Sequence, residues 1–495
     1  MSTSNSKPKA IIIGAGIAGM ACAIDLAANG FEILVLEKNE SWGGRARQFQ
    51  ANGFYFDQGP SWYWMPDIFE GFFKKYSRRT SDYFHLIHLD PSYRIFFEND
   101  QLDASANIET IYKIFEDLEE GSSLFLKEFL KEAKFKYETG MEEFVRKPSL
   151  KWTEYLNWNL LKSFFRMDLF RSIEMVIKRR IKHPYLVQWL LFPILFLGAK
   201  PSKTPAIYSL MNYADFKLGS WYPLGGMVKL MDAFYHLALE KGVTFHFNSN
   251  VEHIDIVNSC AVGVIANSKT FDANVIVSAA DYEFTEQSLL DEEYRQYPIS
   301  YWNTRVMAPS ALLFYLGFDT KLEGLLHHNL FFDASFEMHA SEIYDKHSWP
   351  EQPLFYVCVP SKTDERIAPP GKENVFILIP ISTEVEDSEA KRIEYFEKVM
   401  DRIENKIKQE IRSKIIYKRT YCIQDFKQDY NSFKGNAYGL ANTLRQTAFL
   451  KPKIRHKKIK NLYFAGQLTH PGPGLPPSMI SGEIVASLIL KTQFQ

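Results

Sequence analysis

The chain has 495 residues, with 58 Lys and Arg against 59 Asp and Glu. A formal net charge of −1 offers no overall field for a polyanion, so nucleic acid is excluded as the expected partner. The length predicts two or three lobes, and the apolar share of 46% is that of an ordinary globular protein and argues against extensive disorder.

The aromatic content is unusually high, with 39 Phe, 26 Tyr and 9 Trp. Such rings bury large areas and can also line deep apolar pockets. Composition alone leaves both interpretations open, a Phe-rich core and a ring-lined ligand pocket.

The four cysteines are scattered along the chain, at Cys22, Cys260, Cys358 and Cys422. They form neither a zinc-binding spacing nor a disulfide scaffold, which favours a reducing, cytoplasmic compartment. Residues 1–9 do not fit a signal peptide, and no stretch reaches the roughly 18–20 apolar residues needed to span a bilayer.

The first 37 residues carry the strongest pattern. Residues 9–13 predict a buried strand, the following G-A-G-I-A-G predicts a turn that opens a helix, and residues 31–36 predict a second strand that ends at Glu37. A strand, a G-x-G-x-x-G turn, a helix and an acid about 20 residues further on are the parts of a dinucleotide-binding unit.

Each part of this unit has a mechanical reason. Gly14 allows the tight turn, Gly16 lets the backbone approach a pyrophosphate, and Gly19 packs the helix against the sheet. The helix N-terminus offers free N–H groups to phosphates, and Glu37 can accept from ribose hydroxyls. The sequence therefore predicts a dinucleotide site.

Two glycine-containing loops follow. In S-W-G-G-R-A-R (41–47), Arg45 can neutralise a phosphate or lie beside a ring system, and the alternative is a tight loop with solvated arginines. In D-Q-G-P-S-W (57–62), small residues suit a backbone that lies against a flat ligand.

Residues 105–220 are helical in pattern. The segment 162–182 is strongly basic and runs into the apolar, aromatic segment 185–197. Such a pair can lie in a membrane interface, and the alternative is a buried core helix beside a solvated basic face.

Further along, G-G-M (225–227) opens a helix, and residues 275–281 predict a buried strand that rejoins the dinucleotide sheet. Residues 300–430 predict alternating strands and charged helices. His327 and His328 lack a helical i,i+4 partner or a nearby acid cluster, so we expect structural or surface histidines and no metal site.

The C-terminus predicts a strand, a glycine turn at Gly466, a stiff H-P-G-P-G-L-P-P loop (470–477) and a final helix from Met479. No second G-x-G-x-x-G occurs, so a separate nicotinamide-binding unit is not expected. One dinucleotide site with a distant glycine turn favours a tightly held flavin.

Together these motifs resemble the bacterial-type phytoene desaturases, which are carotenoid desaturases of the flavin amine-oxidase superfamily. The resemblance covers nearly the whole chain in order and rests on the segments 14–19, 37–38, 43–46, 56–60, 222–227, 463–466 and 470–476. The first motifs are shared by the superfamily, whereas the G-P-S-W-Y-W-M-P stretch (59–66) and the Pro/Gly loop narrow it to the carotenoid branch. Gln467 and His470-Pro-Gly-Pro depart from the smaller residues of many relatives and leave the exact carotenoid open.

The resemblance implies FAD as the cofactor, a peripheral position on the inner face of the membrane, and stepwise dehydrogenation of a C40 polyene, phytoene toward lycopene. It also implies a set of flavin-binding positions, with Val251 at the adenine end and Gly466 and Met479 at the flavin end. The set is Gly14, Ala15, Gly16, Gly19, Glu37, Lys38, Gly44, Arg45, Gly59, Pro60, Ser61, Val251, Gly466 and Met479.

The fold expected is α/β, a Rossmann-like FAD-binding domain of the amine-oxidase type with an inserted α+β substrate domain and a helical, membrane-facing lobe. We place the FAD-binding domain in residues 1–105, 220–290 and 435–495, the helical lobe in 106–219, and the substrate domain in 291–434.

The reaction expected is loss of two hydrogens from neighbouring carbons, one of them as hydride to the flavin. A hydrocarbon substrate taken from the lipid phase calls for a long, aromatic-lined tunnel, and oxygen or a quinone would take the electrons. The sequence does not identify a catalytic residue for the proton.

Alternatives on the same fold are a desaturase of a hydroxylated or C30 carotenoid, a carotene isomerase, an amine oxidase, and a non-catalytic isoprenoid-binding protein. The complete glycine set with Glu37 argues against the last, because a carrier needs no pyrophosphate cradle.

Overall fold

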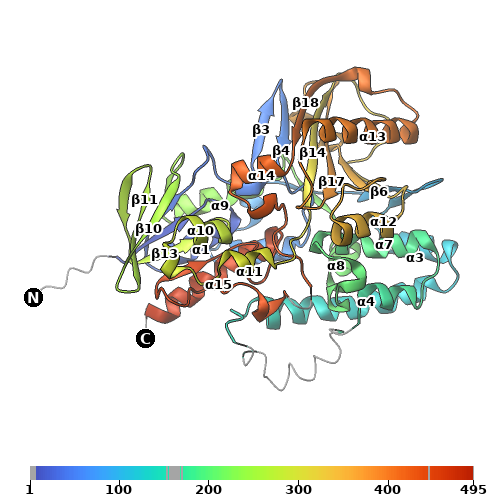
Figure 1. The fold of residues 1–495 in the computed structure, drawn as a ribbon. Coiled ribbons are helices and arrows are strands. Elements are labelled where there is room, and N and C mark those ends of the chain that lie inside the picture. Colours follow the sequence, from blue (N-terminus) through green and yellow to red (C-terminus); the bar gives the residue numbers. More distant parts are fainter. Residues whose placement is uncertain (1–6, 152–153, 155–167, 169–170, 444–445, 494–495) are drawn as a thin grey trace, which may run out of the picture.

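The computed structural model describes residues 7–151, 154, 168, 171–443 and 446–493. Two sheet-based lobes lie side by side, and a group of helices lies beneath the second lobe (Figure 1). The N- and C-termini both lie at the first lobe.

The first lobe is built on a parallel sheet of five strands in the order β19-β13-β1-β2-β9. Its strands are short and mostly buried, as in a sheet covered by helices on its faces. They are β1 (Lys9–Ile13), β2 (Glu32–Leu36), β9 (Thr244–His246), β13 (Val275–Ser278) and β19 (Leu462–Phe464). Helix α1 (Ile17–Ala28) packs against α9 (Val228–Glu240) and α15 (Leu475–Gln493).

The register joins segments that lie far apart in the sequence, because Ile11 of β1 pairs with Leu34 of β2 on one side and with Ile276 of β13 on the other. The same lobe carries an antiparallel sheet of β10 (Val251–Val257), β11 (Cys260–Ala266) and β12 (Lys269–Asp272). Its remaining helices are α10 (Tyr282–Ser288) and α11 (Ile299–Asn303).

The second lobe is a seven-stranded sheet in the order β18-β14-β17-β16-β15-β6-β7. Its neighbours are antiparallel except for the parallel pair of β15 and β6. The strands are β6 (Tyr93–Phe96), β7 (Gln101–Ala104), β14 (Ser310–Phe318), β15 (His328–Phe331), β16 (Phe355–Cys358), β17 (Glu373–Ile381) and β18 (Ile415–Tyr421).

One face of this sheet is covered by α13 (Glu389–Ile407), whose buried Phe396, Val399 and Ile403 belong to the same core as Phe314 of β14. Helix α14 (Ile423–Tyr430) lies nearer the first lobe, and α12 (Phe336–Ser341) lies between the seven-stranded sheet and the helices beneath it (Figure 1). Two antiparallel two-stranded sheets also occur in the described part of the chain, the hairpin of β3 (Gln48–Ala51) with β4 (Phe54–Asp57) and the long-range pair of β5 (Leu86–His88) with β8 (Trp221–Pro223).

The helical group comprises α3 (Ile108–Leu118), α4 (Ser122–Thr139), α6 (Ile173–Lys178), α7 (Pro184–Leu191) and α8 (Leu210–Tyr213). Helix α2 (Pro66–Lys74) packs against α9 of the first lobe, where Phe72 and Phe73 contact Phe234. The apolar segment 185–197 begins as α7, and its Leu186, Trp189 and Leu190 are completely buried. The structure therefore favours the core interpretation of this segment over a membrane interface, because the side chains through Ile194 pack inside the protein.

Eight of the 21 residues of the basic segment 162–182 lie outside the described residues, in 162–167 and 169–170. Of the part that is described, Lys178 pairs with Glu174 and Glu337, and Arg180 lies within 3.7 Å of Glu128. No helix among the described residues is long and apolar enough to cross a bilayer.

The expected α/β fold with an added α+β domain is confirmed. The boundary at residue 105 differs from the structure, because β6 and β7 pair with β15 in the seven-stranded sheet and so join the second lobe. A strand's own residues do not indicate which sheet it enters when its partner lies more than 200 positions away. The other boundaries stay predictions.

Candidate active site

The glycine turn at the end of β1 opens into a cavity of about 460 Å³ that extends from the first lobe into the second. Gly14 has φ +101°, and α1 begins at Ile17 with Gly16 as its N-cap. A Cβ at Gly16 would meet no atom within 4 Å, so the backbone faces open space there. A Cβ on Gly19 would lie 2.1 Å from the Gly14 carbonyl oxygen, which explains why the helix can approach the turn only with glycine at 19.

Glu37 lies at the end of β2, 5% exposed, and borders the same cavity. One carboxylate oxygen accepts from the backbone N–H of Ala15 at 2.8 Å, and the other accepts from the backbone N–H of Asn39 at 2.9 Å. The carboxylate thus holds the turn from behind and keeps lone pairs for a ribose. Lys38 also borders the cavity, and its Nζ donates to the carbonyl of Gln428.

Arg45 projects from the Gly43–Gly44 loop into the cavity wall, which does not fit the alternative of a solvated arginine. Its Nη2 donates to Ser432 Oγ at 3.1 Å, and its guanidinium lies 5.0 Å from the Tyr430 ring centroid. Burial lowers the pKa of Arg45, and the nearby Asp281 carboxylate opposes this shift. Its Nε is buried and has no hydrogen-bond partner in the described part of the chain, so one donor is left for a ligand.

The loop 59–61 forms the next part of the wall. A Cβ on Gly59 would lie 2.5 Å from the carbonyl oxygen of Arg45, so the two glycine loops approach each other closely. Pro60 and Ser61 border the cavity, and the Ser61 side chain interacts with the Tyr356 hydroxyl.

The structure brings most of the predicted cofactor positions together on one surface. Eleven of them border the cavity: Gly14, Gly16, Glu37, Lys38, Gly44, Arg45, Gly59, Pro60, Ser61, Val251 and Gly466. Three do not. Gly19 packs against the turn, the Ala15 N–H is donated to Glu37, and Met479 is completely buried in the core on α15.

Several cavity residues escaped the sequence reasoning, among them Ser249, Asn250, Asp281 and Tyr430. The sequence could have indicated Asp281 as a site residue, since it ends the segment 275–281, which is expected to be a strand that rejoins the dinucleotide sheet. Burial raises the pKa of Asp281, and Arg45 acts in the opposite direction. No sequence signal indicates Tyr430, because the sequence of α14 predicts only a charged helix.

Beyond Ser61 the wall becomes apolar. Rings and aliphatic side chains from five separate stretches of the chain border this chamber, including Trp62, Trp64, Phe69, Phe192, Leu330, Phe332, Phe336, Ile343, Phe355, Tyr356, Phe376 and Leu378. The two interpretations of the aromatic surplus are therefore both realised, because other rings such as Phe314 and Phe396 pack in the cores.

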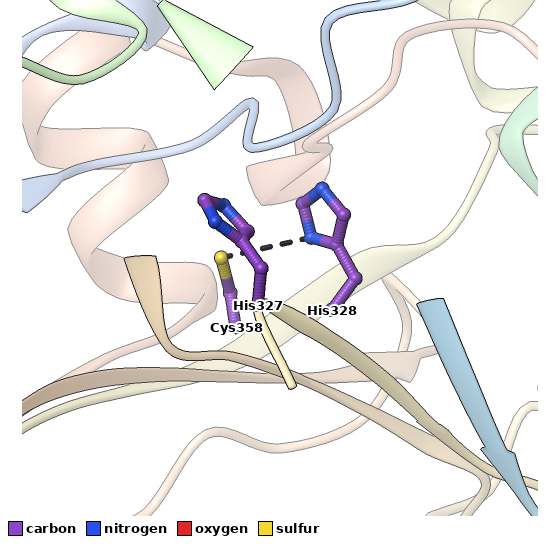
Figure 2. Close-up of side chains that lie close together, drawn as sticks. All are labelled: His327, His328 and Cys358. Carbon is purple, nitrogen blue, oxygen red and sulfur yellow. Dashed lines mark hydrogen bonds between the residues drawn. The ribbon is translucent and has the colours of Figure 1, made fainter. Parts of the chain in front are cut away.

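His327 and His328 are buried, at 5% and 0% exposure, so the surface interpretation is wrong. His328 lies opposite Cys358 in the pairing of β15 with β16, and its Nδ1 is 3.8 Å from Cys358 Sγ (Figure 2). Hydroxyls contact both rings, Thr363 Oγ1 at 2.7 Å from His327 Nδ1 and Tyr356 OH at 2.6 Å from His328 Nδ1.

Burial lowers the pKa of His327 to about 3 and that of His328 in the same direction, so both rings are neutral. The two histidines and Cys358 offer ligand atoms within 4.8 Å of one another. The prediction of no metal site used spacing along the chain, which cannot detect a partner on a neighbouring strand.

Residues 17–490 match the family described as flavin containing amine oxidoreductase. A carotenoid 3,4-desaturase of Haloarcula japonica is 37% identical over 97% of both chains. A zeta-carotene-forming phytoene desaturase of Myxococcus xanthus is 29% identical over 99% of this chain and 95% of its own. Among solved structures, a putrescine oxidase variant matches 98% of this chain and 99% of its own with a TM-score of 0.63 at 12% identity, which shows a shared fold.

The chain belongs to the flavin containing amine oxidoreductase family. It is an FAD-dependent oxidoreductase, and its expected resemblance to carotenoid desaturases is confirmed. The site fits FAD, since the open face of Gly16, the unpartnered Arg45 Nε and the carboxylate of Glu37 face one cavity.

Proposed function

We propose that the protein removes two hydrogens from neighbouring carbons of a carotenoid and so forms a new C=C bond. The observation that carries this proposal is the continuity of the cavity, which runs from the glycine turn past Ser61 into the aromatic chamber. A cofactor held at the turn and a long apolar substrate in the chamber would meet at the Gly59–Ser61 segment.

The chamber suits a polyene because hydrogen bonds cannot orient a hydrocarbon. Shape and ring contacts must do so, and Trp62, Phe192 and Phe336 supply flat apolar surfaces from three different segments. The same lining excludes water from the reacting carbons.

Bound FAD supplies a hydride acceptor for such a reaction. The residues of this chain hold the pyrophosphate and ribose at the turn, align the polyene and keep the chamber dry. The second hydrogen leaves as a proton, for which we assign no catalytic residue. Turnover needs an electron acceptor, and we propose oxygen or a quinone.

We favour a bond near one end of an acyclic carotenoid, at the 3,4 position, because the 37% identical relative bears that name. Conversion of phytoene toward lycopene is the second candidate, supported by the 29% identical phytoene desaturase. We also propose that the substrate reaches the chamber from the inner face of a membrane, since a carotenoid resides in lipid.

The test uses the FAD-loaded protein with liposomes that contain either phytoene or an extended acyclic carotenoid, in the presence of oxygen or an added quinone. Each new double bond lengthens the conjugated system and shifts its absorption to longer wavelength. We expect such a shift with the extended carotenoid. Absence of new conjugation with both substrates and both acceptors would contradict the proposal.

A further inference from the structure

Two histidines and a cysteine meet where β15 pairs with β16. His327 directly precedes β15, and His328 begins this strand opposite Cys358 at the end of β16. Each of the three residues is at most 5% exposed, and one ligand atom from each lies within 4.8 Å of the other two (Figure 2). Imidazole nitrogen and thiolate sulfur are ligands that zinc prefers, whereas Mg²⁺ and Ca²⁺ take oxygen. The cluster thus has the donor set of a zinc site.

The surroundings of His327 engage one ring nitrogen and leave the other. Thr363 Oγ1 lies 2.7 Å from His327 Nδ1. A ring N–H that donates to an oxygen is the arrangement typical of a metal-binding histidine, because it leaves the lone pair of the second nitrogen for the ion. That second nitrogen, Nε2, is buried and has no hydrogen-bond partner among the described residues. Since buried polar atoms are rarely left without a partner, this nitrogen calls for a ligand.

A small cavity of about 20 Å³ adjoins the cluster. His327 and Cys358 border it together with Asp57 and Tyr222, and its volume admits one water molecule. The Tyr222 hydroxyl is buried and also lacks a hydrogen-bond partner within the described part of the chain. A water in this cavity has the Tyr222 hydroxyl and the Asp57 carboxylate as partners.

We propose that His327, His328 and Cys358 bind one Zn²⁺ ion, with a water in the small cavity as the fourth ligand. Tetrahedral zinc with bonds of about 2.0–2.3 Å holds its ligand atoms roughly 3.3–3.8 Å apart, so the three atoms need to approach one another by at most about 1.5 Å. On binding, the Cys358 S–H loses its proton to solvent and the sulfur forms the bond to zinc. The thiolate and the Asp57 carboxylate together balance the charge of the ion, as a buried site requires.

The zinc site lies behind the segment where we place the reacting carbons. Ser61 and Phe376 border both the small cavity and the large one, so they form part of the wall between them. The Tyr356 hydroxyl, 2.6 Å from His328 Nδ1, also interacts with the Ser61 side chain. Zinc at His328 replaces this hydroxyl as the partner of the ring, and Tyr356 keeps Ser61. The role of the ion is structural, because it joins β15 to β16 behind this wall.

The test uses the FAD-loaded protein, freed of metal with a chelator and titrated with Zn²⁺ against a chromophoric competitor. We expect one equivalent to bind and the thermal unfolding midpoint to rise by about 3 °C or more, because an ion that binds only the folded state stabilises it. Co²⁺ in place of Zn²⁺ should give the near-ultraviolet absorption band of a cobalt–thiolate bond.

Cys358→Ser removes the sulfur with little change in volume, and it should lower Zn²⁺ affinity about 100-fold or more and abolish the cobalt band. Cys260→Ser is the matched control, since Cys260 is the one cysteine of the four that is not buried and would take up metal adventitiously. It should change neither the affinity nor the band.

Retained flavin absorption shows that a variant is folded. If Cys358→Ser loses it, His327→Gln, which removes the Nε2 ligand, tests the same claim with the same expected loss of affinity. Zn²⁺ affinity of the wild type no higher than that of the folded ligand variant, or an equal loss in Cys260→Ser, would overturn the inference. No step measures carotenoid conversion, so the result does not depend on the proposed desaturation.

Discussion

The two ends of the cavity are lined by different kinds of atoms. At the β1–α1 end the wall is mainly backbone and small residues such as Gly14 and Gly44, with Glu37 and Arg45 as the charged groups. At the β16–α12 end it is mainly rings, and its polar groups are neutral. The difference matches the two ligands proposed, because phosphates and ribose are bound by N–H groups and charges, whereas a carotenoid is bound by area and shape.

A substitution in the glycine turn between β1 and α1 should have the largest effect, a loss of FAD affinity. Gly16 has φ −77°, which any residue adopts, and a Cβ there meets no protein atom. Gly16→Val should therefore fold normally but fill the space of the pyrophosphate, and we expect FAD affinity to fall more than about 100-fold in a flavin-fluorescence titration.

The control is Gly71→Ala on α2, which also meets no atom within 4 Å but lies away from the cavity. It should bind FAD as the wild type does. Unchanged flavin binding in Gly16→Val would remove the turn from the cofactor site and break the comparison.

The second prediction concerns Lys451, a buried base that lies behind the Pro/Gly loop (470–477). Lys451 is 2% exposed, its Nζ has no partner within the described residues, and burial lowers its pKa to about 7. His470 and Asn442 line the same space, since Asn442 Oδ1 and the Lys451 Nζ both lie near Gly472 and His470 interacts with Lys451.

A folded pKa below the unfolded value of 10.5 means that the unfolded chain binds more protons between pH 7 and 10.5. The unfavourable contribution is thus largest below pH 7 and fades as the pH rises. Lys451→Met should raise the free energy of unfolding by about 2–4 kcal/mol at pH 7 and by less than about 1 kcal/mol near pH 10. Denaturant titrations at both pH values measure this, with the exposed Lys460→Met as the control, and a gain that does not depend on pH would contradict the account.

At the aromatic end, loss of a ring should reduce activity without loss of cofactor. Phe336 borders the chamber, and Phe336→Ala should lower kcat/KM for a carotenoid about tenfold with FAD affinity unchanged. Phe396→Ala removes a ring of similar burial from the core of the second lobe and should reduce stability alone. Equal losses of activity in the two variants would mean that Phe336 acts only through packing.

The smallest effect on FAD affinity is expected for the contact between the Arg45 guanidinium and the Tyr430 ring at the cofactor end. Tyr430→Leu removes the aromatic face 5.0 Å from the Arg45 guanidinium and should weaken FAD about two- to fivefold. Tyr301→Leu, which removes a comparable ring from Arg305 at 4.4 Å outside the cavity, should leave FAD affinity unchanged. A matching loss in both would show that the effect is not local.

The ends also differ in how far sequence could predict them. The turn, Glu37 and Arg45 lie within 32 consecutive residues and carry their roles in local geometry, so a pattern of glycines and one acid indicates them. The chamber is assembled from segments that lie between Trp62 and Leu378, and pairing of β15, β16 and β17 brings Leu330, Tyr356 and Leu378 side by side. The residues next to His339 in the sequence do not indicate that the Leu354 N–H donates to its Nδ1. The residues next to His328 likewise do not indicate that Cys358 lies opposite it.

The apolar segment 185–197 shows the same limit, since composition alone fits a lipid interface and a core equally well. Only packing decides between them, and Trp189 and Leu190 are completely buried in the structure.

Single-turnover mixing without oxygen tests most directly whether one cavity serves both ligands. FAD-loaded protein is mixed with carotenoid-containing liposomes, and flavin absorption and polyene absorption are followed together. The account predicts that flavin bleaching and the red-shifted polyene appear at the same rate and in equal amounts. A flavin that stays oxidised while carotenoid is bound, or new conjugation without flavin bleaching, would contradict it.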